Sequence, residues 1–287
     1  MTAHKKLHNS SVKIPKFITV TAKTLEAVSR PLAVKFMMRL FTTPIKHKIP
    51  KREEEMNRNS RQELVLVPSL NKSINVYHLG ENPKKVLLVH GWSGRGTQLH
   101  SIAARLIKNG YSTISFDAPA HGKSTGKTSD MTEFIASILL LEQKYGPFEY
   151  AIGHSLGAMA VLNAVKHGLK IKKAVTIGSG DVIKDIMDDF TKKLGMDIAT
   201  GSMMIHKFEK KFGQTINNYS AYIAAKEVTI PVLMFHDNDD ADVPVSAAYH
   251  IKNNLAHATL VVTNGLGHRK ILGDKTVIKQ ITDFIEQ

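Results

Sequence analysis

The sequence has 287 residues, of which 43% are hydrophobic and 22% charged, and it contains no cysteine. This size and composition are typical of one α/β domain with a sizeable core. The missing cysteine excludes disulfides, thiolate catalysis and thiolate zinc sites, and makes a cytoplasmic setting the default expectation. No apolar run approaches the ~20 residues of a membrane span, and residues 1–9 lack the apolar core of a signal peptide.

The formal net charge of +14 is concentrated near the N-terminus. Residues 1–62 carry 14 Lys and Arg against 4 Asp and Glu, a charge of +10, whereas residues 63–287 carry 25 against 21, a charge of only +4. The basic character therefore belongs to an N-terminal arm, and we expect no nucleic-acid-binding surface on the body of the protein.

The arm, residues 1–62, is predicted to be partly helical. Apolar residues recur in it at helical spacing, at Leu25, Val28, Leu32, Phe36 and Leu40. Pro31 is well placed to begin a second helix and Pro44 to end it. We expect this stripe to pack on the body, because such stripes are usually buried. Contact of a basic amphipathic helix with an anionic membrane surface is the alternative.

Residues 63–287 are predicted to form one domain. Strand-like runs cover residues 64–67, 73–78, 86–89, 111–116, 149–152, 174–177, 231–235 and 258–262, and helical runs cover 101–108, 132–144, 156–167 and 276–286. The first two strands resemble an antiparallel pair, and the later alternation of strand and helix predicts a mostly parallel sheet covered on both faces. The helix-like run at 181–229 interrupts this alternation and is predicted to be a small cap.

One stretch, residues 150–160, reads as an apolar strand that turns at Ser155 directly into a helix. Such a turn requires strained backbone at the serine and small neighbours, here Gly153 and Gly157. It also leaves the Leu156 N–H at a helix N-terminus, where an oxyanion could form. The same Gly-x-Ser-x-Gly pattern recurs around Ser124, but a polar loop without helical periodicity follows it. We therefore expect Ser155, and not Ser124, to be the nucleophile.

Five landmarks follow one another at the predicted ends of parallel strands, at residues 89–92, 117–124, 153–157, 236–244 and 267–268. In this order and at these intervals the chain resembles the serine-nucleophile branch of the α/β-hydrolase superfamily, over roughly residues 63–287. The resemblance implies an α/β-hydrolase fold and a serine, acid and histidine triad in that chain order.

The resemblance implies that a histidine late in the chain is the base, and His268 fits best because it lies between glycines after a predicted strand. His250 and His257 are the competitors. Asp240 matches the acid position of the family pattern His-Gly-x-x-Asp-x-x-Val-Pro, although Asp237 stands where glycine is usual. Asp239, in the same loop, and Asp181, after the previous strand, remain alternatives for the acid.

The Trp92 N–H, directly after His90-Gly91, is the second oxyanion donor that the resemblance implies, and Trp92 as a wall of the pocket is the alternative. The histidines at 90, 121 and 154 fall where the family has histidines, and no Asp or Glu lies near them at a spacing typical of metal ligands. We therefore expect no metal and no other cofactor.

A serine nucleophile indicates acyl transfer to water. We expect hydrolysis of a carboxylic ester or thioester of a small molecule. Because the cap is rich in Met and Phe, we expect the acyl group to be apolar. These residues could equally pack the cap onto the body. A peptidase, an amidase, a carbon–carbon bond hydrolase and a non-catalytic binding protein of the same fold are the alternatives. The sequence leaves the acyl and alcohol specificity and the oligomeric state open.

Overall fold

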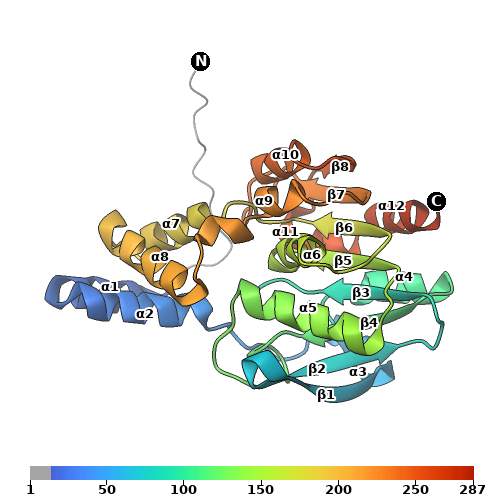
Figure 1. Ribbon diagram of the computed structural model, residues 1–287, viewed down its shortest axis with the longest axis horizontal. Coiled ribbons are helices and arrows are strands. Elements are labelled where there is room, and N and C mark those ends of the chain that lie inside the picture. The colour runs from blue at the N-terminus through green and yellow to red at the C-terminus, as the bar shows by residue number, and fades with distance from the viewer. Residues whose placement is uncertain (1–13) are drawn as a thin grey trace.

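The computed structural model describes residues 14–287 and is built on one eight-stranded sheet (Figure 1). The strand order is β1-β2-β4-β3-β5-β6-β7-β8. Their bounds are β1 (Arg61–Val67), β2 (Lys72–Leu79), β3 (Lys85–Val89), β4 (Ser112–Asp117), β5 (Tyr150–His154), β6 (Lys173–Ile177), β7 (Val232–Asp237) and β8 (Ala258–Thr263). Strand β2 pairs antiparallel with both β1 and β4, and all other pairs are parallel. The predicted fold class is confirmed.

The first 13 residues of the predicted arm, and the residues considered for a signal peptide, lie outside the described residues. Within residues 14–287, no helix is both long and apolar enough to cross a membrane.

Helices cover both faces of the sheet, and strand β3 shows how its two cores are separated. Leu87 and Val89 face one core, whereas Val86 and Leu88 face the other, because side chains alternate along a strand. On the first face lie α5 (Met131–Tyr145), α6 (Leu156–Lys166), α9 (Ala221–Ala225) and α10 (Ser246–Lys252), and on the second lie α3 (Glu54–Asn59), α4 (His100–Lys108) and α12 (Lys275–Glu286). All the central strands are therefore buried on both sides, which explains their continuous apolar runs.

The arm and the cap share one helical lobe beside the sheet (Figure 1). Its helices are α1 (Lys16–Val28), α2 (Arg30–Thr42), α7 (Ile183–Lys193) and α8 (Ile198–Phe212). Helix α2 contacts both α1 and α8. Ala33, Val34 and Met37 are fully buried there, and the Phe41 ring meets those of Phe190 and Phe208 edge-on, with centroids 5.2 and 6.0 Å apart.

The buried face of the arm differs from the apolar stripe expected from sequence. Val28 and Leu32 of that stripe are exposed, and its other members are half-buried. Small residues such as Ala22 and Ala33 are fully buried instead, and small side chains let helix backbones approach one another.

The segment after α2 is attached to the loops at one end of the sheet. Thr42 O accepts a hydrogen bond from Ser129 N (2.8 Å), and Ile45 N donates to Ser93 Oγ (3.0 Å). The guanidinium of Arg95 donates to the carbonyl of His47. The arm thus lies against the loop that follows β3.

Candidate active site

The turn between β5 and α6 has the strained geometry expected of a nucleophile elbow. Ser155 has φ 54° and ψ −119°, a left-handed φ that L residues rarely adopt. A Cβ on Gly153 would lie 2.5 Å from the carbonyl oxygen of Gly157, and one on Gly157 would lie 2.4 Å from the carbonyls of Val89 and His90. Glycine is therefore required at both positions for α6 to pass so close to β3 and β5.

His268 and Asp240, the predicted base and acid, are hydrogen-bonded to each other. Nδ1 of His268 lies 2.7 Å from Oδ2 of Asp240, and the Asp240 side chain is 1% exposed. Because an ionised carboxylate only accepts, Nδ1 carries the hydrogen, which leaves the lone pair on Nε2. This is the tautomer that a general base requires.

Asp240 stays ionised despite its burial. Desolvation raises the pKa of this carboxyl, but the hydrogen bond from His268 and the backbone N–H groups of Val243 and Asp242 outweigh it. Oδ1 accepts from these two N–H groups at 2.8 and 2.9 Å. The net result is a pKa below the ordinary value for Asp240.

His154 connects the elbow to the His268 loop. Its ring centroid lies 4.6 Å from that of His268, and its Nε2 lies 2.8 Å from the His268 carbonyl oxygen, to which it donates. Burial, followed by the neighbouring His268, lowers the pKa of His154 to about 3. His154 therefore stays neutral beside His268. Sequence reasoning assigned it no role, because only the fold brings these two loops together.

The loop after β3 passes directly beside the serine. A Cβ on Gly91 would lie 3.0 Å from the Ser155 Cβ, so any larger residue would force the serine or the loop to shift. Gly91 N donates to Gln98 Oε1 (2.9 Å), which fixes the loop. Trp92 follows, with its ring centroid 5.0 Å from that of His121. Gly91, the residue before Trp92, and Leu156, the first residue of α6, thus both lie next to the serine.

The remaining candidates for acid and base have other partners. His250 Nδ1 lies 2.5 Å from Asp181 Oδ2, and the Tyr222 ring stacks on His250 at 4.6 Å, which forms a second acid–histidine pair that the sequence did not predict. Asp239 accepts from Gly265 N (2.8 Å) at the surface, where His257 is also exposed. Of the candidates considered, the structure brings only Asp240 together with His268.

Asp237, which replaces the usual glycine of the family pattern, holds the His268 loop. Its Oδ2 accepts from Thr263 Oγ1 (2.6 Å) and from Leu266 N (3.1 Å), and its Oδ1 accepts from Asp239 N (2.9 Å). Burial raises the pKa of Asp237, but these hydrogen bonds outweigh it and the pKa is lowered overall.

Ser124, in the second Gly-x-Ser-x-Gly pattern, is a buried structural residue. Its hydroxyl donates to Asp117 O (2.5 Å) and accepts from Asn75 N (2.8 Å), so it connects the end of β4 to β2. Both hydroxyl functions are thus used inside the fold.

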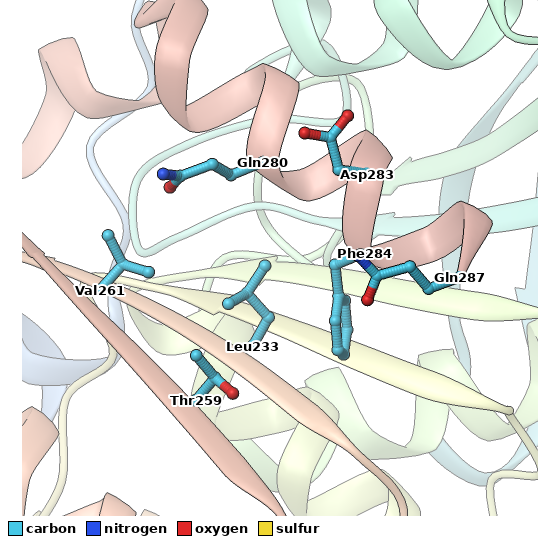
Figure 2. Close-up of a pocket in the computed structure, with 7 residues that line it drawn as sticks. All are labelled: Leu233, Thr259, Val261, Gln280, Asp283, Phe284 and Gln287. Carbon is cyan, nitrogen blue, oxygen red and sulfur yellow. The ribbon is translucent and has the colours of Figure 1, made fainter.

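Two surface hollows lie outside this cluster. One, of about 310 Å³, lies between α12 and strands β7 and β8 and is lined by residues that include Leu233, Val261 and Phe284 (Figure 2). The other, of about 550 Å³, lies between the arm and the loop after β4. Neither is lined by Ser155, Asp240 or His268. No group of three or more His, Asp or Glu side chains within residues 14–287 is arranged to hold a metal ion.

A mostly parallel sheet covered on both faces, with a strained serine after one strand and a histidine–aspartate pair after two others, is the arrangement of an α/β-hydrolase. Comparison with known proteins agrees. Residues 86–215 match the model of the alpha/beta hydrolase family, and residues 213–287 match that of TAP-like proteins. The chain belongs to the α/β-hydrolase superfamily.

Individual relatives are distant. The chain is 23% identical over 253 residues to a non-heme haloperoxidase of Rhodococcus erythropolis, covering 71% of this chain and 92% of that protein. Its fold is similar to an esterase from Exiguobacterium antarcticum (16% identity, TM-score 0.64, 79% of this chain and 100% of that chain). It is also similar to an esterase of Pyrococcus furiosus (19%, TM-score 0.64, 85% and 97%).

Proposed function

We propose that the protein is a serine hydrolase that cleaves a carboxylic ester or thioester through an acyl-enzyme on Ser155. The observation that carries this proposal is the 2.7 Å bond between His268 Nδ1 and the buried Asp240, in a loop that His154 holds beside the elbow. It supports His268 as the general base and Asp240 as the residue that orients it.

In the proposed reaction, His268 Nε2 accepts the proton of Ser155 Oγ as this oxygen attacks the carbonyl carbon. The oxyanion of the tetrahedral intermediate accepts hydrogen bonds from the N–H groups of Leu156 and Trp92. The intermediate then expels the alcohol or thiol, which takes the proton from His268. Water attacks the acyl-enzyme by the same steps, which releases the acid and restores Ser155.

We propose an apolar acyl group for the substrate. Six of the cap side chains on which this expectation rested, namely Leu194, Met196, Met204, Ile205, Phe208 and Tyr219, are buried in the core. Support comes instead from Ile186 of α7, which is 39% exposed. A Cβ on Gly180 would lie 3.3 Å from Ile186 Cδ1 and 2.8 Å from Met159 Sδ of α6, so an exposed apolar side chain of the cap lies close to the helix that follows the serine.

Labelling with a fluorophosphonate probe tests the nucleophile. We expect the wild type to be labelled and to hydrolyse p-nitrophenyl esters of graded acyl length, and Ser155→Ala to do neither. Ser124→Ala is the matched control, and it should retain labelling and most of the activity because its hydroxyl is buried in structural bonds. Labelling of a folded Ser155→Ala variant, or none of the wild type, would overturn the assignment.

The same enzyme preparations separate the other activities of this fold. Aminoacyl anilides test for a peptidase or amidase, and bromide with hydrogen peroxide tests for the activity named in the Rhodococcus relative. If the anilides were hydrolysed in preference to every ester, the proposed substrate would be an amide and not an ester, while Ser155 would remain the proposed nucleophile. Halogenation without any ester hydrolysis would contradict the proposal.

A further inference from the structure

Helix α1 has an outward face without any charged residue. Phe17, Val20, Thr24 and Val28 are all exposed and recur every three or four residues, which places them on one side of the helix. Phe17, Val20 and Val28 expose 70%, 62% and 76% of their surface. The opposite side, which includes Ala22, packs inside the lobe. Helix α1 thus has two apolar sides, of which one is buried against the rest of the lobe and the other is exposed to solvent.

Other helices of the lobe also expose apolar side chains. Leu32 on α2 is 52% exposed and Ile198 on α8 is 66% exposed. Asp197, the residue before Ile198, accepts a hydrogen bond from Arg30 and donates its N–H to Glu26 Oε1 (3.0 Å), so Ile198 lies near the end of α1, beside Glu26. Of the eleven large apolar side chains that are exposed in residues 14–287, seven belong to the four helices of this lobe. Most of the large apolar side chains that are exposed in the described residues therefore belong to this lobe.

Cations lie along one edge of the uncharged face. Lys16 and Lys23 are exposed along one of its edges. Glu26, the sole acidic residue of α1 and α2, lies away from this face and accepts from the loop before α8. The preceding sequence, residues 1–13, contains three further lysines and no Asp or Glu. An apolar strip with a cationic border complements a surface of anionic groups above a hydrocarbon layer.

We propose that α1 docks the protein on anionic lipid bilayers, lying in the plane of the interface with Phe17, Val20 and Val28 inserted among the lipids. Packing of the arm and membrane contact are then compatible, because they use opposite sides of the same helix. A second copy of the chain fits this face less well. A symmetric dimer through α1 would bring the lysines of both copies together, and this face has no carboxylate to balance them.

Sedimentation with vesicles tests the proposal without reference to catalysis. The wild type should bind vesicles that contain phosphatidylglycerol, bind phosphatidylcholine vesicles much less, and dissociate as NaCl is raised from about 0.05 to about 0.5 M. Phe17→Glu should lower the partition coefficient at least about tenfold, because one aromatic side chain no longer inserts and a negative charge faces the anionic lipids. Val20→Glu provides an independent second variant.

Leu64→Glu is the matched control. Leu64 is 60% exposed on β1, so this variant makes the same exchange of an apolar side chain for a negative charge away from the lobe, and binding should stay within about twofold of the wild type. Equal loss in Leu64→Glu and Phe17→Glu would overturn the proposal. So would a wild type that ignores the vesicles and sediments as a dimer that Phe17→Glu separates into monomers, because the face would then be a subunit interface.

Discussion

Asp240 divides its two oxygens between His268, the proposed base, and the backbone. Oδ2 faces His268, and Oδ1 accepts from the N–H groups of Asp242 and Val243. This second set of bonds fixes the carboxylate in one rotation, so that His268 is held by a rigid partner. The histidine in turn donates from Nδ1, and its orientation depends on that single carboxylate oxygen.

We therefore expect Asp240→Asn to reduce kcat/KM by about three to four orders of magnitude, because an amide cannot accept at both positions and favours the wrong tautomer of His268. The measurement is ester hydrolysis beside fluorophosphonate labelling rates. Asp239→Asn is the control and should retain most of the activity, since the Asp239 carboxylate lies at the surface and accepts from Gly265 N. A larger loss in Asp181→Asn than in Asp240→Asn would assign the acid to the pair with His250.

At the scale of single elements, the helices of the arm form part of the folded core. Met37 on α2 is fully buried in the core that includes Met204 and Phe208 of α8. Leu32, on the same helix, is 52% exposed. The two side chains are similar in size but differ in burial, which makes them a matched pair.

Met37→Ala should lower the free energy of unfolding by about 2–5 kcal/mol, because it removes buried methylene groups and leaves a cavity. Leu32→Ala should change it by less than about 1 kcal/mol. Urea unfolding curves with equal m-values give both differences. If the two variants were equally stable, α2 would not be part of the cooperative core.

The sequence predicted the elements of the domain because their signals are local. The strand expected at residues 149–152 is β5 (Tyr150–His154), and Ser155 was distinguished from Ser124 by the helical spacing that follows it. The pairing of Asp240 with His268 followed from the family pattern. The contact of α2 with α8 and the pair of His250 with Asp181 could not be predicted, because each joins segments that are far apart in the chain.

At the scale of the whole molecule, stability in acid depends on buried histidines that are neutral in the folded protein. Burial lowers the pKa of His121 to about 3, assisted by the neighbouring His90, while the carbonyl of Pro119 acts in the opposite direction. In the unfolded chain a histidine titrates near ~6.5. Between these two values the unfolded state binds one more proton than the folded state, so this group makes stability fall as the pH falls.

His121→Phe should remove this dependence. The ring contacts with Trp92 and Phe134 are retained by a phenyl group, whereas the proton is not bound by either state. As the pH falls from about 6 to 4, the wild type should therefore lose about 1.4 kcal/mol of unfolding free energy per pH unit relative to the variant. Urea titrations at several pH values measure it, and a constant difference would show that His121 is protonated in the folded protein.

The contact of the arm with the cap also sets an order of events during synthesis. Glu26 and Asp197, which join α1 to the loop before α8, are 171 residues apart in the chain. At ribosomal rates of about 5–20 residues per second, roughly 10 to 30 s pass between the appearance of one and of the other. During that interval Val34 and Met37 have no partner on α8. Helix α2 therefore reaches its native packing against α8 only after most of the sheet has been synthesised.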